Sequence, residues 1–325
     1  MRISMTPTQR VKFGFRRSRR LWGFSRRTMI VPRRIRFGMR AQVEANQAVR
    51  EKAMLPVPAQ AWPVLASSGT LSVRVAQSDH EVEAAQRLRY HIFYEEMSAI
   101  PTPEMRKTGR DFDKYDAFCD HILVIDNATP GEDGGPAVVG TYRLLRGEVA
   151  ALHGGYYTSL EYDLTTMLDV NPPGTRFVEL GRSCVLKPYR SKAVTMQLHW
   201  KGVMAYVGRH SIDVMFGCGS LPGTDPDALA LPLSYLHHFH RAPVGSGLRA
   251  RPELYVEMNR MAKDAIDPKE ALRALPPLIK GYVRAGSYIG DGAVVDKQFG
   301  TTDVLIYFPV AQIDPRVRSR FSAKK

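Results

Sequence analysis

The strongest constraint on the fold is a series of short apolar segments, starting at residue 71, that change between strand and helix patterns. Residues 71–76 alternate apolar and other side chains, which is typical of a strand. Residues 79–96 instead repeat apolar side chains at helical spacing, and Ser78 or Asp79 can cap that helix. The apolar face comprises Val82, Ala85, Leu88, Ile92 and Phe93. A chain of this kind must pack helices against a sheet.

The remaining segments extend the same pattern. After a polar loop through Pro101, Pro103 and Asp111, strands are predicted at 121–125, 137–145, 176–185, 214–217 and 303–308. Helices are predicted at 190–209, 226–239 and 269–285, the last interrupted by Pro276 and Pro277. The turn residues between 130 and 136 favour an antiparallel hairpin. This order predicts an α/β (α+β) fold: a mixed, mostly antiparallel sheet with helices on both faces.

The net charge is unevenly distributed along the chain. The whole sequence holds 46 Lys and Arg against 32 acids, but residues 1–50 hold 14 Lys and Arg against one acid, Glu44. Arginines interleaved with bulky apolar residues suit an anionic membrane surface. Binding to nucleic acid, a solvated tail, and translation from Met29 or Met39 are the alternatives. Because prolines punctuate residues 51–69, we predict a basic extension and linker over 1–69 and a folded domain over 70–325.

The compartment and the absence of a metal site are also expectations from the sequence. Three widely spaced cysteines argue against a disulfide framework and for a reducing compartment. No apolar run reaches the roughly 18 residues that a membrane-spanning helix needs. The His237-His238-Phe239-His240 stretch lacks partners at ligand spacing, so no metal site is expected. We therefore expect a cytoplasmic protein at the inner face of the cell membrane.

Four local patterns combine charges with apolar residues. They are Arg89–Phe93, Asp111–Asp116, Gly140–Leu145 and Glu179–Arg182. Arginines on neighbouring strands can meet acids from the loop, which makes their burial tolerable. Glu179 and Arg182 would face opposite sides of a regular strand, so a shared site requires a bulge. Gly181 suits such a distortion.

In this order, the patterns resemble two related branches of the N-acetyltransferase (GNAT) superfamily. These are the acyl-homoserine-lactone synthases and the ornithine Nα-acyltransferases that make lyso-ornithine lipid in bacteria. The stretches at 94–97, 216–226, 275–282, 290–296 and 301–304 favour the second branch. The resemblance covers roughly residues 71–321. It implies transfer of a 3-hydroxyacyl chain from acyl carrier protein to the α-amine of L-ornithine, with no further cofactor.

The resemblance also implies roles for individual residues. Glu179 becomes the candidate general base, and the backbone around Gly181–Ser183 the contact for the thioester and its oxyanion. Arg182 is grouped with these catalytic residues. The predicted substrate-binding residues are Arg89, Phe93, Asp113, Asp116, Arg143 and Ser183. Trp200, like Phe93, is either an acyl-pocket wall or part of the core.

The turn after the strand predicted at 176–185 indicates which molecule donates the acyl group. Ordinary acetyltransferases bind pyrophosphate there with a glycine-rich turn, but residues 187–193 contain no glycine. This departure favours acyl carrier protein over coenzyme A. The predicted carrier-protein and pantetheine contacts are Lys187, Tyr189, Arg190 and Lys192, and solvated helix residues are the alternative.

The acceptor is the least determined part of this interpretation. Asp225, Asp291 and Asp303 are candidates for binding the second amine of ornithine. Lysine, glycine or glutamine as acceptor, an acyl-homoserine-lactone-type signal synthase, and a binding protein without activity remain alternatives.

The basic extension generates the first prediction. Deleting residues 1–50 should weaken sedimentation with anionic vesicles at least tenfold, because it removes most of the net positive charge. Turnover on water-soluble substrates should be unchanged. Equal binding of both forms to the vesicles would contradict a membrane role for the extension.

Overall fold

The computed structural model describes residues 63–131, 134–191 and 193–317. All of them belong to one unit of the chain, Ala53–Lys325. Residues 1–62, and with them most of the predicted extension and linker, lie outside the described residues.

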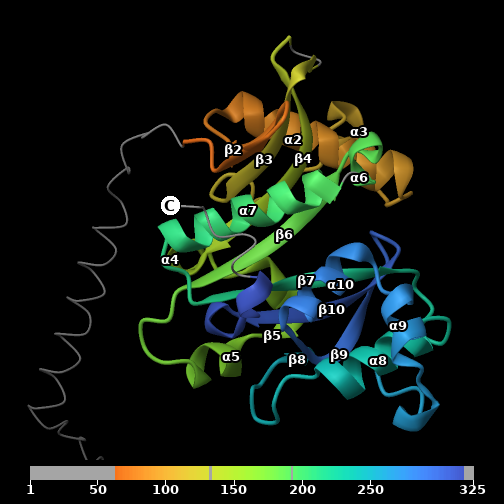
Figure 1. The fold of residues 1–325 in the computed structure, drawn as a ribbon. Coiled ribbons are helices and arrows are strands. Elements are labelled where there is room, and N and C mark those ends of the chain that lie inside the picture. Colours follow the sequence, from red (N-terminus) through yellow and green to blue (C-terminus); the bar gives the residue numbers. More distant parts are fainter. Residues whose placement is uncertain (1–62, 132–133, 192, 318–325) are drawn as a thin grey trace, which may run out of the picture. The chain divides into compact units, whose positions relative to one another are not determined.

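The strands of the described part form one sheet in the order β1-β2-β3-β4-β6-β7-β10-β9-β8-β5 (Figure 1). Their bounds are β1 Ala66–Ser68, β2 Leu71–Val75, β3 Asp120–Pro130, β4 Pro136–Arg146, β5 Tyr162–Asp163, β6 Phe177–Val185, β7 Val214–Pro222, β8 Arg249–Ala250, β9 Tyr288–Asp296 and β10 Thr301–Pro309. Within this sheet β6 pairs with β7, and β8 with β9, in parallel, and the other pairs are antiparallel.

Helices and single helical turns connect these strands. The helices are α2 Asp79–Tyr90, α3 Pro103–Thr108, α4 Gly147–Leu152, α5 Thr165–Val170, α6 Lys187–Arg190, α7 Ala193–Arg209, α8 Ala230–His240, α9 Pro268–Ala274 and α10 Pro277–Ala285. A π-helix, η1 His91–Glu96, extends α2, and 3₁₀ turns lie at η2 Tyr157–Leu160, η3 Lys263–Ala265 and η4 Val310–Gln312. None of the described helices combines the length and apolarity needed to cross a membrane.

Alternation along β3 explains why helices cover both faces of the sheet. Ile122 and Val124 belong to the core formed with α7, whereas Leu123 and Ile125 pack with Ala85 of α2. Successive side chains of a strand point to opposite faces, so one apolar run supplies both layers. The predicted mixed sheet with helices on both faces is confirmed.

The parallel pairing of β6 with β7 covers only the first part of each strand, so the two halves of the sheet separate beyond it. Pairing runs only from Phe177↔Val214 to Glu179↔Phe216, after which the strands diverge (Figure 1). Gly217 lies at the point of divergence with φ +155°, and a Cβ there would lie 2.2 Å from the carbonyl oxygen of Leu180. Only glycine fits so close an approach of the two backbones. The divergence opens the cleft described below.

Several elements differ from the sequence prediction. Residues 66–68, predicted as linker, form β1 and pair with β2 around the turn at Gly69. The strand β9 was missed because Gly290 and Gly292 weaken its apolar pattern, and β5 and β8 are only two residues long. The polar loop contains α3, which begins with Pro103 and is capped by Thr102.

Other predictions of local structure are confirmed. They are the cap of α2 by Ser78, the hairpin β3–β4 and the helix pair α9–α10.

Candidate active site

A cavity of about 370 Å³ occupies the space where β6 and β7 diverge. Eight predicted site residues line it: Phe93, Arg143, Glu179, Gly181, Arg182, Ser183, Arg190 and Asp303. Arg89, Asp113 and Asp116 do not line the cavity and instead lie in the layer behind it.

Arg89 is the centre of that layer. Its side chain is completely buried, and its guanidinium donates to Asp111 at 2.6 Å and to Asp116 at 2.8 Å and 3.0 Å. Burial alone would raise the pKa of Asp116, but Arg89 and Arg143 lower it to about 2. Tyr94 donates a further hydrogen bond of 2.9 Å to Asp111. The polar atoms of this layer are thus bonded to one another, as burial of charge requires.

Arg143 and Arg182 connect this layer to the cavity. Arg143 donates to Asp113 at 2.7 Å, and Arg182 donates to the other oxygen of Asp113 at 3.2 Å. The guanidinium of Arg182 also lies between two rings, 4.9 Å from the centroid of Tyr157 and 4.7 Å from that of Phe299. The predicted charged cluster is therefore assembled as a continuous network, which we call the arginine–aspartate cluster.

A bulge in β6 brings Glu179 and Arg182 to the same cavity. Between the pairs Thr141↔Cys184 and Arg143↔Gly181, β6 holds one residue more than β4. The distorted residue is Arg182, with φ +52°, and not Gly181, at which the distortion was predicted. A left-handed conformation costs a non-glycine residue about 1–2 kcal/mol, and the contacts of the Arg182 side chain offset that cost. At Gly181, a Cβ would meet no atom within 4 Å, so the absent side chain leaves the cleft open.

Glu179 is held by backbone N–H groups of η2, on the other side of the cavity. Its carboxylate accepts hydrogen bonds from the N–H groups of Tyr157, at 3.0 Å, and Thr158, at 2.5 Å. Burial raises the pKa of Glu179, and these hydrogen bonds partly counteract the rise. The side chain reaches this wall because Glu179 and Phe177 share the face of β6 that packs on residues 150–167.

The residues predicted to contact the carrier protein differ in their exposure and in their partners. Lys187 is exposed at the start of α6, whereas Tyr189 is buried and donates to Asp126 at 2.8 Å. Arg190 forms an ion pair with Glu96 at 2.7 Å. Lys192 lies outside the described residues.

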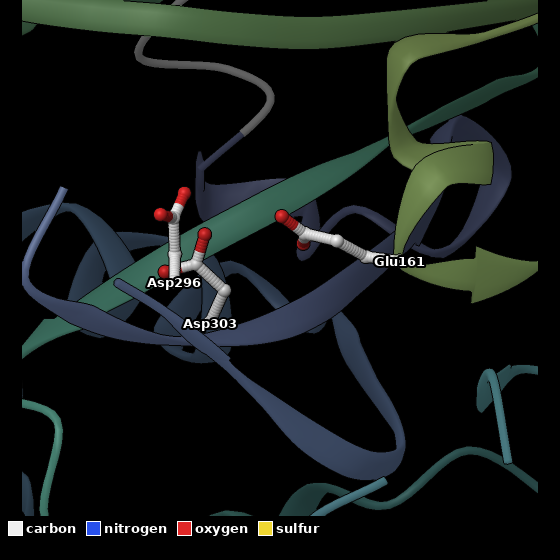
Figure 2. Close-up of side chains that lie close together, drawn as sticks. All are labelled: Glu161, Asp296 and Asp303. Carbon is white, nitrogen blue, oxygen red and sulfur yellow. The ribbon is translucent and has the colours of Figure 1, made fainter. Parts of the chain in front are cut away.

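An acidic cluster lies at the other wall of the cleft, where two of its members, Asp296 and Asp303, line the cavity. Glu161, Asp296 and Asp303 each place one carboxylate oxygen within 4.8 Å of the others (Figure 2). Cys218 donates to Glu161 at 3.1 Å, and Thr301 donates to Asp303 at 2.9 Å. Burial, and then the proximity of the other acids, raises the pKa of both Glu161 and Asp303. No salt bridge joins these three acids to a described Lys or Arg, so the group favours a positively charged ligand.

Of the three acids predicted to bind the second amine of ornithine, only Asp303 belongs to this group. Asp291 instead pairs with Arg241 at 2.9 Å and with Arg249, and Asp225 is exposed. Glu161 and Asp296 were missed because they lie in segments far apart in the sequence that only the fold brings together. Cys184, beside the bulge, has a pKa raised to about 12 by burial, which disfavours it as a nucleophile.

Comparison with known proteins connects this geometry to a family. The acetyltransferase (GNAT) domain family matches residues 88–200. An L-ornithine N(alpha)-acyltransferase of Rhizobium meliloti (strain 1021) is 49% identical over 281 residues, which cover 86% of this chain and 93% of the relative. The chain belongs to the L-ornithine N(alpha)-acyltransferase family. A second member, from Brucella abortus (strain 2308), is 48% identical over 261 residues, or 80% of this chain and 92% of its own length.

Membership of this family makes the chain an acyltransferase, and the predicted family and fold class are confirmed. Among solved structures, FeeM, an N-acyl amino acid synthase from uncultured soil microbes, covers 77% of this chain and 94% of its own. The two share 12% identity and a TM-score of 0.43, a likeness too low to bear on function.

The arginine–aspartate cluster generates a stability prediction. We expect Arg89→Met to lower the free energy of unfolding by about 3–5 kcal/mol, measured by urea denaturation, because Asp111 and Asp116 then stay buried without their nearest cationic partner. Arg74→Met is the matched control, since its pair with Glu81 is partly exposed and contributes about 1 kcal/mol or less. Equal losses for the two variants would contradict the role of burial.

Proposed function

We propose that the chain transfers a 3-hydroxyacyl group from acyl carrier protein to the α-amine of L-ornithine, which gives lyso-ornithine lipid. The observation that carries the proposal is a cleft with two different walls. One wall is the bulged, glycine-containing end of β6, and the other contains Asp296 and Asp303, with Glu161 beside them in the acidic cluster. The activity in the names of the relatives fits this arrangement.

The β6 wall suits an acyl thioester. Beyond Glu179 the strand has no pairing with β7, so its inner edge is free to bind an extended ligand. The open space at Gly181 allows a thioester to approach the backbone, whose N–H groups can stabilise the developing oxyanion. The glycine-free turn at residues 187–193 supports a carrier protein as the donor.

The acidic wall suits the acceptor. Ornithine carries a side-chain ammonium in addition to its reacting amine, and buried carboxylates stabilise such a charge. With the side chain held there, the α-amine can point towards the thioester on β6. The reaction forms an amide bond, breaks the carbon–sulfur bond and releases the thiolate of the carrier's pantetheine, while the amine loses a proton.

Glu179 is the proposed acceptor of that proton, directly or through a water. It lines the cavity, and burial raises its pKa towards the range useful for a base near neutral pH. The α-amine, with a pKa of about 8, needs only modest assistance.

The product of the reaction provides the direct test. Purified protein, 3-hydroxyacyl carrier protein and L-ornithine should yield lyso-ornithine lipid, identified by mass spectrometry. Product with S-adenosylmethionine but not with ornithine would overturn the proposal in favour of a signal synthase. Comparable rates with lysine, glycine or glutamine would overturn the choice of acceptor.

The acidic cluster gives a sharper prediction about specificity. Asp303→Asn should raise KM for ornithine at least tenfold, because a charged hydrogen bond contributes about 1.5–3 kcal/mol. Norvaline, which lacks the second amine, is the matched control substrate, and its KM should not change. An undiminished preference for ornithine over norvaline would contradict the assignment. Loss of wild-type activity on chelation would instead indicate that the carboxylates bind a divalent cation.

The raised pKa values predict an effect of pH on stability. A carboxyl whose pKa is higher in the folded than in the unfolded state stabilises the fold below its unfolded pKa, and this contribution is lost as pH rises through the folded value. Glu161→Gln should therefore raise Tm by about 2–4 °C at pH 8, with the gain disappearing near pH 4. A gain that does not vary with pH would show that charge is not the cause.

The turnover assay with 3-hydroxyacyl carrier protein and L-ornithine also tests Glu179. Glu179→Gln should lower kcat most near pH 7 and less near pH 9.5, where the amine is already deprotonated. A deficit that is equal at both pH values would assign Glu179 to holding Tyr157 and Thr158 rather than to proton transfer.

A further inference from the structure

The guanidinium of Arg182 contacts two aromatic rings that come from segments attached to the other half of the sheet. Tyr157 belongs to η2, which leads into β5, and its ring centroid lies 4.9 Å from the guanidinium carbon. Phe299 lies in the turn between β9 and β10, and its centroid lies 4.7 Å from the same carbon. Because β6 and β7 do not pair beyond Glu179, the two rings provide contact across the open part of the sheet.

The turn that carries Phe299 is fixed from both sides of the cleft. The side chain of Asp296 accepts hydrogen bonds from the backbone N–H groups of Gln298, at 2.7 Å, and Phe299, at 3.0 Å. From the other side, the N–H group of Ile100 donates to the carbonyl oxygen of Gln298 at 2.8 Å. The position of the Phe299 ring is therefore set by its own turn and by the loop before α3.

Phe299 also contacts the helix that extends α2. Its ring packs edge-on against Phe93 of η1, with centroids 5.6 Å apart, and its centroid lies 6.0 Å from that of Tyr94. Tyr94 in turn donates to Asp111 of the arginine–aspartate cluster. Since Phe299 lines the cavity as well, one ring joins the β9–β10 turn to the charged layer and to the bulge of β6.

Arg182 needs these contacts because its backbone is strained and its polar contacts are long. Its φ of +52° lies in the left-handed region, which is unfavourable for a residue with a side chain. Its hydrogen bond to Asp113 measures 3.2 Å, and its Nε lies 3.6 Å from Asp111, whereas charged pairs usually bond at about 2.7–2.9 Å. Aromatic faces stabilise a guanidinium, most strongly where water is excluded. The two rings therefore contribute to holding Arg182, and with it the bulge, in place.

We propose that Phe299 is a positioning residue for acyl transfer. By holding the guanidinium of Arg182, it fixes the bulge that directs the backbone around Gly181 and Ser183 towards the thioester. The inference rests on the proposed function, because it concerns the same site. It deepens that function by assigning a part in the reaction to a side chain without a reactive group, in a turn far from β6 in the sequence.

Kinetics of Phe299 variants test the proposal on the full chain. Phe299→Leu keeps an apolar side chain but removes the aromatic face, and it should lower kcat about tenfold with 3-hydroxyacyl carrier protein and L-ornithine. KM for ornithine should change less than about twofold, because stabilisation of the oxyanion acts in the transition state. Phe299→Tyr, which restores the ring, should recover kcat. A loss of kcat that tyrosine does not restore, or a raised KM with unchanged kcat, would overturn the proposal.

Phe239→Leu is the matched control. Phe239 of α8 also has a cation over its ring, since Nζ of Lys263 lies 5.3 Å from the centroid, but Phe239 does not line the cavity. The loss of this contact should leave kcat unchanged. Equal losses in the two leucine variants would show that the effect on kcat is unspecific and would contradict the role of Phe299.

A second substitution tests whether Phe299 acts through Arg182. Arg182→Lys keeps the positive charge but lacks the planar group that stacks on a ring. In this background, Phe299→Leu should lower kcat by less than about threefold, because the two residues no longer act together. An undiminished loss of about tenfold would mean that Phe299 acts elsewhere, and the proposal would fail.

Hydrogen exchange without substrate separates this proposal from the proposed function. In a peptide spanning residues 177–186, Phe299→Leu should speed amide exchange about tenfold, and Phe239→Leu should not. If wild-type protein does not acylate ornithine, the proposed function fails, but the exchange rates still decide the role of Phe299. Faster exchange only in Phe299→Leu supports that role, and equal exchange in wild type and Phe299→Leu overturns it.

Discussion

The bidentate contacts of Arg89 with Asp111 and Asp116 are the interaction on which the rest of the site depends. A guanidinium without solvent exposure needs several acceptors, and the loop after α3 supplies them. This fixes Asp113, which in turn accepts from Arg143 of β4 and Arg182 of β6. The left-handed backbone of Arg182, and with it the bulge, is thus held by charges that begin on α2.

The divergence of β6 and β7 opens the cleft in front of this charged layer. Gly217 permits one very close contact between the two strands, and beyond it they share no hydrogen bonds. One edge then offers free backbone groups, whereas β9 and β10 contribute carboxylates to the facing wall. An acylation between a thioester and a charged amine needs both environments within one small volume.

Prediction from the sequence succeeded where local patterns carry the information. Four local patterns indicated that arginines of the strands meet acids of the loop, and the resemblance to the family named Arg89, Asp113, Asp116, Arg143 and Arg182 as that charged cluster. It failed where the fold joins distant segments: Glu161 and Asp296 are separated by more than one hundred residues, and the stretch 290–296 indicated the family without indicating a role for Asp296. The bulge was predicted, but its left-handed residue is an arginine, because side-chain contacts outweigh the preference for glycine.

The hydrogen bonds from Tyr157 and Thr158 to Glu179 make the two walls of the cleft energetically inseparable. Tyr157 lies on the guanidinium of Arg182, and Glu161 follows at the end of the same short segment. The Glu179 carboxylate thereby fixes the position of Glu161 relative to the bulge at Arg182. Substitutions on the two sides should consequently be non-additive in a double-mutant cycle, although no direct contact joins them. A change in the acceptor that such a cleft binds would then require coordinated changes in β6 and in the segment from Tyr157 to Glu161.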